Sequence, residues 1–133
     1  MFYDYSIAIP ANTTKANSVI EICKMTYGII KHVAIAFPPG PKGLAHLTVY
    51  RFEHQVWPSN PDGDFAWDNF TIEFNEEFDL TEKPHVLTLR GWNDDDTYPH
   101  TITVRFELGG KEWGLSDLLS IQTPMSRLED WES

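Results

Sequence analysis

The chain has 133 residues, of which 41% are hydrophobic and 14% are aromatic, so we expect one domain with one apolar core. Its 10 Lys and Arg residues against 20 Asp and Glu residues give a formal net charge of −10, which disfavours nucleic acid and anionic membranes as partners. The single cysteine, Cys23, excludes an intramolecular disulfide and is predicted to be a small buried residue.

Apolar and polar residues alternate along most of the chain, and clusters of Pro, Gly, Asn and Asp interrupt the alternation about every ten residues. This pattern is typical of strands with one buried face. The predicted strands, in chain order, are residues 2–9, 19–25, 29–37, 44–57, 70–74, 85–92 and 101–108.

The clearest of these strands is residues 101–108, in which Ile102, Val104 and Phe106 share one face with Leu108. Residues 85–92 are predicted to pair with it as a hairpin, with the acidic residues 93–99 as the connecting tip.

The sequence therefore predicts an all-β fold: an antiparallel two-sheet sandwich, jelly-roll-like, with seven to eight strands in residues 1–110. Residues 111–133 break the rhythm and are predicted to form a C-terminal arm, either extended or with a short helical turn. The arm is too apolar for a tail in free solvent, so we predict that it carries an interface made by Trp113, Leu115, Leu118, Leu119 and Trp131.

The histidines do not show the spacing of a zinc site, because none of them forms a His-x-His or His-Glu-x-x-His pattern. The densest oxygen-rich segment is Asp94, Asp95 and Asp96, which is a candidate for calcium. It lacks the spacing of an EF-hand loop, and side chains that bond their own backbone at a solvated tip explain the segment as well. No cofactor is predicted.

The chain is predicted not to be an enzyme, since it has no nucleophile elbow and no phosphate-binding glycine loop. Several aromatic residues lie near predicted loops, where exposed rings would suit sugar stacking. The candidate ligand platform is Trp57, Trp67, Trp92 and Tyr98. The alternative is that most of these rings close the ends of the core.

Three stretches carry a resemblance to a known group of proteins. They are Phe37-Pro38-Pro39-Gly40 followed by Gly43-Leu44-Ala45-His46, then Trp57-Pro58-Ser59-Asn60-Pro61-Asp62, and Trp92-Asn93-Asp94-Asp95-Asp96-Thr97-Tyr98-Pro99-His100-Thr101. Between residues 9 and 108, the chain resembles small β-sandwich structural and accessory proteins of tailed-phage virions. The resemblance implies a capsid decoration, cement, vertex or head-fibre module that is made in the host cytoplasm and is located in the virion.

Two hypotheses follow from these observations. In the first, the protein is a structural accessory component that forms a cyclic homo-oligomer, expected to be a trimer, and docks onto a capsid or other virion protein. In the second, it is a carbohydrate-binding module that uses the aromatic platform, with calcium held by the acidic loop.

Overall fold

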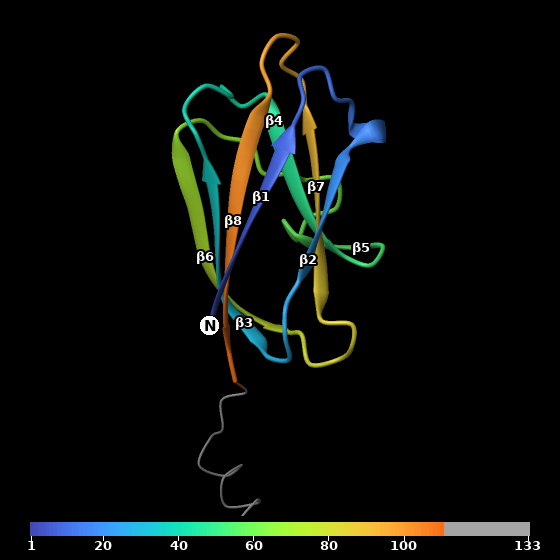
Figure 1. Cartoon of the computed structure of the whole chain (residues 1–133), viewed down its shortest axis with the longest axis vertical. Coiled ribbons are helices and arrows are strands. Elements are labelled where there is room, and N and C mark those ends of the chain that lie inside the picture. The colour runs from blue at the N-terminus through green and yellow to red at the C-terminus, as the bar shows by residue number, and fades with distance from the viewer. Residues whose placement is uncertain (111–133) are drawn as a thin grey trace, which may run out of the picture.

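Eight strands form two four-stranded antiparallel sheets that pack face to face (Figure 1). The computed structural model describes residues 1–110, so the predicted arm and its interface residues lie outside the described part. The strands are β1 (Phe2–Ile9), β2 (Val19–Lys24), β3 (Ile29–Phe37), β4 (Ala45–Arg51), β5 (His54–Trp57), β6 (Phe70–Asp79), β7 (Val86–Asn93) and β8 (His100–Gly109). One 3-10 turn, η1 (Lys15–Asn17), precedes β2.

The strand order identifies the sandwich as a jelly roll. One sheet has the order β1-β8-β3-β6 and the other has the order β2-β7-β4-β5. Each early strand pairs with a late one: β1 with β8, β2 with β7, β3 with β6 and β4 with β5. The chain therefore forms one long ribbon of antiparallel pairs, and successive pairs fall in alternate sheets. The predicted fold class is confirmed.

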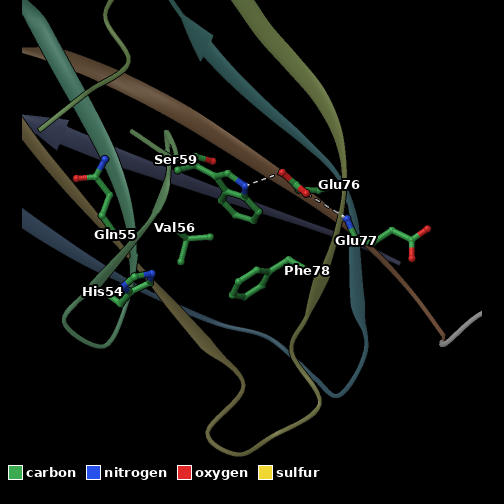
Figure 2. A pocket seen from close by; sticks show the side chains of 8 residues that line it. His54, Gln55, Val56, Ser59, Glu76, Glu77 and Phe78 are labelled. Atoms are coloured by element: carbon green, nitrogen blue, oxygen red, sulfur yellow. Dashed lines mark hydrogen bonds between the residues drawn. The ribbon is translucent and has the colours of Figure 1, made fainter. Parts of the chain in front are cut away.

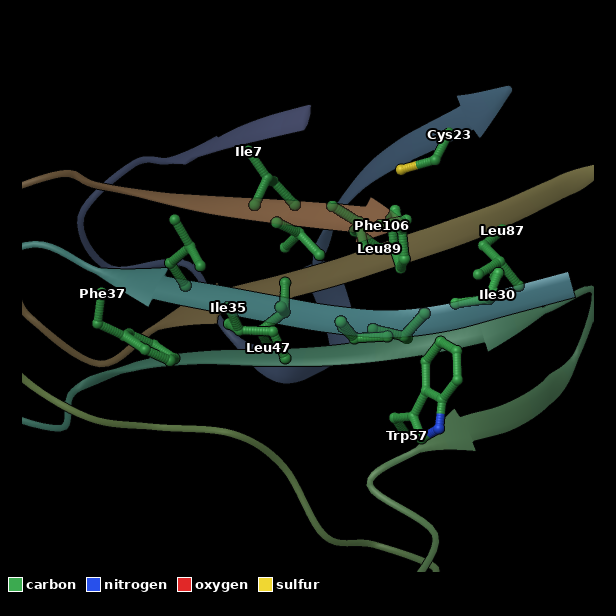
Figure 3. Close-up of a cluster of buried hydrophobic side chains, with 14 of the residues drawn as sticks. Ile7, Cys23, Ile30, Ile35, Phe37, Leu47, Trp57, Leu87, Leu89 and Phe106 are labelled. Atoms are coloured by element: carbon green, nitrogen blue, oxygen red, sulfur yellow. The ribbon is translucent and has the colours of Figure 1, made fainter. Parts of the chain in front are cut away.

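The core lies between the two sheets, where the inward residues of each strand meet (Figure 3). On β8, Ile102, Val104, Phe106 and Leu108 are buried, as predicted, and their neighbours Thr101 and Arg105 are exposed. Cys23 also lies in this core, and burial raises the pKa of its thiol to about 12. The prediction of a buried cysteine is confirmed, and the thiol stays protonated at neutral pH.

The predicted hairpin of residues 85–92 and 101–108 is wrong. β7 pairs with β2 and β4, whereas β8 pairs with β1 and β3. Residues 94–99 therefore cross from one sheet to the other at the end of the sandwich. The alternation of side chains defines each strand but is the same for any antiparallel neighbour, so it does not reveal the partner.

The predicted strand 44–57 is two strands, β4 and β5, joined by a tight turn at Phe52 and Glu53. Phe52 has a φ of 56°, a left-handed conformation that aromatic residues rarely adopt, and its ring lies under the guanidinium of Arg51. The turn contains no Gly, Pro or Asn, and this explains why the sequence did not reveal it.

Within residues 1–110, no helix is long and apolar enough to cross a membrane.

Candidate functional site

The two open sides of the sandwich are the candidate functional surfaces, because each presents two sheet edges. β1 and β2 are edge strands that contact each other on one side, where the Tyr5 hydroxyl donates a hydrogen bond to the Lys24 carbonyl. β5 and β6 are the edge strands of the other side. An edge strand has unpaired main-chain groups, which are able to pair with another chain.

The β1 edge is long and regular. All eight residues of β1 pair with β8 without a register shift, and Asp4 is its only charged residue. The Met1 ammonium donates to the Leu108 carbonyl, and the Leu108 amide donates to the Met1 carbonyl. Because hydrogen-bonded residues alternate along an antiparallel pair, the odd residues of β1 bond β8. The even residues, including Ser6, direct their main-chain groups away from the sheet.

The other three edges carry features that discourage pairing. β2 has six residues and β5 has four, and β2 places Glu21 and Lys24 on its edge. β6 contains four carboxylates and also a β-bulge. Phe78 pairs with Ile30 and Asn75 pairs with His32, so two residues of β6, Glu76 and Glu77, lie opposite one residue of β3. Short strands, charges and bulges are the devices by which natural sheets avoid edge-to-edge association. β1 is the least protected edge of the sandwich.

A groove separates β5 from β6 on the opposite side (Figure 2). It contains a hollow of about 320 Å³ lined by His54, Gln55, Val56, Trp57, Ser59, Glu76, Glu77 and Phe78. His54 and Gln55 lie on one side of the hollow, and Glu76 and Glu77 lie on the other. The Trp57 indole Nε1 donates a hydrogen bond of 3.1 Å to Glu76 Oε2, so this carboxylate is held in place from within the sandwich.

The loop end of the sandwich contains a stack of polar and aromatic side chains. The His46 ring lies on the Trp92 ring with centroids 5.1 Å apart and planes 7° apart, and the Lys15 ammonium is 5.2 Å from the centre of the Trp92 ring. His46 Nδ1 is 2.9 Å from Asp64 Oδ1, and His46 Nε2 is 2.9 Å from Asp94 Oδ2. Carboxylates accept only, so both bonds form when the imidazole carries two protons.

The calcium candidates Asp94, Asp95 and Asp96 have other partners. Asp95 accepts hydrogen bonds from the amides of Thr97 and Tyr98 and from His100 Nε2, and these bonds lower the pKa of its carboxyl, the His100 bond most of all. Asp94 accepts from His46, and Asp96 accepts from the Thr97 hydroxyl. Among residues 1–110, no three His, Cys, Asp or Glu side chains come together in a way that would hold a metal ion.

The four rings of the candidate ligand platform do not form one surface. Trp57 is 4% exposed and Trp92 is 6% exposed, so neither can stack on a ligand. Trp67 and Tyr98 are 53% and 65% exposed. The Trp67 ring contacts Phe70, which is also exposed, with centroids 5.4 Å apart. The prediction placed the platform residues near loops, whereas Trp57 belongs to β5 and Trp92 to β7. Trp57 packs on Phe106 in the core, and the His46 ring covers Trp92.

The interface candidates Trp113, Leu115, Leu118, Leu119 and Trp131 all lie outside the described residues. No protein-family model and no curated protein matches the chain.

The sequence did not reveal the side-chain bonds of the loop end or the groove. The contacts of His46 join residues 18 and 48 positions apart, and the Trp57–Glu76 bond spans 19 positions. The one available signal was the run of two acids, Glu76 and Glu77, within the apolar alternation of β6, which marks a position where a strand is irregular.

Proposed function

We propose that the protein is a structural component that associates with copies of itself and docks onto a partner. The phage virion accessory proteins that its sequence resembles, such as capsid decoration and vertex modules, work in this way. The observation that carries the proposal is the β1 edge, which has eight regular residues and one charge. At the level of fold alone, the jelly roll is common to viral capsid domains, lectins and cupins, so it agrees with a structural role.

The pairing that this edge favours is symmetric. Two antiparallel copies of β1 would extend the β1-β8-β3-β6 sheet across a two-fold axis, and each copy would offer the same even residues. Four side chains of β1 are exposed: Ser6 and Ala8 are small, and the larger Phe2 and Asp4 lie towards the start of the strand. Such a contact closes as a dimer, whereas the trimer expected from the resemblance needs a different contact.

The test is the solution mass of the full chain by light scattering, with and without a chelator. We expect a discrete oligomer that the chelator does not change. Ser6→Pro removes an outward main-chain amide without removing a bond to β8, and Ser6→Lys adds a charge at the same edge. Both variants are expected to give a monomer.

The matched control for these variants is Thr103→Lys. Thr103 lies beside Ser6 on the same outer face, with the two hydroxyl oxygens 3.4 Å apart, but it belongs to the inner strand β8. This control adds the same charge away from the edge and is expected to keep the oligomer. A monomeric wild-type chain, or a Ser6→Pro variant with unchanged mass, would contradict self-association through β1.

A carbohydrate-binding module is the second candidate function, and the exposed pair of Trp67 and Phe70 favours it. Exposed rings of this kind stack on sugar faces. The test is a titration of tryptophan fluorescence with soluble oligosaccharides such as cellohexaose and chitotetraose. A saturable change that Trp67→Ala abolishes would support this function, and its absence with both sugars would count against it.

A further inference from the structure

The groove between β5 and β6 extends beyond the hollow described above. A second hollow of about 350 Å³ lies beside the first and is lined by Tyr50, Glu53, His54, Gln55, Ser59, Pro61 and Asp62. The two hollows share a wall made by His54, Gln55 and Ser59. Together they form one continuous surface along β5.

The lining of the groove has an apolar base and an acidic rim. Val56, Trp57 and Phe78 form the apolar part, and Trp57 packs edge to face on Phe78 with ring centroids 5.3 Å apart. Glu76 and Glu77 border the first hollow, and Glu53 and Asp62 border the second. Neither hollow is lined by a lysine or an arginine.

The Glu76 side chain is oriented for recognition rather than left free in solvent. The Trp57 indole donates to Oε2, and the Glu77 amide donates to Oε1 at 3.4 Å, so each oxygen of this carboxylate is held by one bond and has a further lone pair (Figure 2). The bulge in β6 at Glu76 and Glu77 gives the strand an extra residue here, and bulges often redirect side chains at binding sites. A long basic side chain would lay its methylene groups on the partly exposed Val56 and Phe78, with Trp57 buried beneath them, and place its cation at these carboxylates.

We propose that this groove binds an extended segment of a partner protein that carries lysine or arginine side chains. The inference rests on the proposed docking role, and it places docking on the side of the sandwich opposite β1. The charge of the rim favours a basic occupant, because its four carboxylates attract lysine and arginine side chains. A second copy of this chain, with a net charge of −10, would be repelled by the same carboxylates. β5 and β6 are edge strands, but the shortness of β5 and the bulge in β6 limit main-chain pairing, so the binding rests on side-chain contacts in the groove.

The experiment is a two-dimensional ¹H–¹⁵N NMR titration of the full chain at an ionic strength of about 20 mM, where charge interactions are weakly screened. The probe is the capped peptide acetyl-Thr-Lys-Thr-Arg-Thr-amide, and its uncharged match is acetyl-Thr-Gln-Thr-Gln-Thr-amide. We expect saturable shifts at the Trp57 indole N–H and at the amides of residues 54–59 and 76–78. The basic peptide should bind more tightly than the uncharged one, and salt at about 300 mM should reduce the difference.

The variants Glu76→Gln and Glu77→Gln each remove one rim charge and should weaken binding of the basic peptide about two- to fivefold. Glu107→Gln, on the outer face of β8 in the same sheet as β6 but outside the lining of both hollows, removes the same charge elsewhere and should leave binding unchanged. If Glu76→Gln does not fold, because it alters the Trp57 bond, Glu77→Gln decides the question, since the Glu77 side chain is exposed.

Equal binding of the two peptides, shifts outside the groove, or an equal effect of Glu107→Gln would overturn the inference. So would the absence of any saturable shift. These outcomes are separate from a failure of self-association: Glu77→Gln should keep the solution mass of the wild type, and Ser6→Pro should still bind the basic peptide.

Discussion

The middle of the sandwich and its loop end are held together by different interactions. In the middle, Phe106 and its neighbours are buried among apolar side chains from both sheets. At the loop end, hydrogen bonds join segments that are distant in the sequence: Asn93 bonds Pro10, His46 bonds Asp64, and the Asp95 carbonyl accepts from the Asn12 amide. The free energy gained by burying apolar area depends little on pH or on the orientation of the side chains, whereas the strength of these hydrogen bonds depends on their geometry and on protonation. The same small domain therefore has a part that tolerates pH changes and a part that responds to them.

The largest effect is expected in the middle. Phe106→Ala removes a fully buried ring that contacts Trp57 and Tyr5, and it should lower the free energy of unfolding by about 3–5 kcal/mol. Denaturant unfolding followed by circular dichroism measures this. Phe70→Ala is the control, because Phe70 is 52% exposed and its removal should change stability by less than about 0.5 kcal/mol. If the two variants lost the same free energy of unfolding, the burial of Phe106 would not account for its contribution to stability.

A smaller effect is expected at the loop end from Asn93→Ala. The Asn93 amide donates to the carbonyls of Ile9, Pro10 and Tyr98, and its oxygen accepts from the Asp95 amide. Since Asn93 is 1% exposed, its loss leaves buried groups without partners and should lower the free energy of unfolding by about 1–3 kcal/mol.

The same denaturant measurement applies to this variant. Asn17→Ala, which removes a single exposed bond to Thr14, is the matched control and should have a change within about 0.5 kcal/mol. A loss for Asn93→Ala as small as that of the control would mean that the loop end does not depend on this side chain.

The smallest effect depends on pH and comes from Asp95. Hydrogen bonds from His100 and from the amides of Thr97 and Tyr98 lower the pKa of this carboxyl below its ordinary value of 3.8 in the folded state. The ionised Asp95 carboxylate therefore contributes its full stabilisation of the folded state at pH values above 3.8. This contribution is lost as the pH falls below 3.8 and the carboxylate takes up a proton.

Melting temperatures of the wild type and of Asp95→Asn, recorded from pH 7 to pH 2, measure this contribution. The wild type should melt a few degrees higher than Asp95→Asn at pH 7, and this difference in melting temperature should disappear below pH 4. Asp96→Asn, at the next position of the same loop, should differ less from the wild type in melting temperature, and this difference should not depend on pH in the same way. A melting-temperature difference for Asp95→Asn that stays constant with pH would contradict the lowered pKa of Asp95.

The strands were predictable from the sequence because each one depends on its own alternation. The bounds of β1 and β3 agree with the prediction, and those of β8 differ by one residue at each end. The pairing of β7 and the turn at Phe52 were not predictable, since both depend on contacts between strands that are distant in the sequence.

The candidate site was less predictable than the fold. Asp95 stood out in the sequence as part of an acidic run, but its role is set by His100, which reaches it only after residues 94–99 cross between the sheets. Trp57 stood out as a loop aromatic, but its indole bonds Glu76 on the opposite edge strand. In both cases the residue type was informative, and the partner was fixed by the fold.

The pairing of the first strand with the last has a consequence for synthesis on the ribosome. β1 ends at Ile9 and its partner β8 begins at His100, so β1 emerges long before the strand that completes its sheet. At about 5–20 residues per second, the ribosome takes roughly 5–20 seconds to make the intervening segment. Throughout that interval β1 has no pairing partner in its own sheet, because β8 is its only hydrogen-bonded neighbour, so this sheet is completed only after the last strand is made.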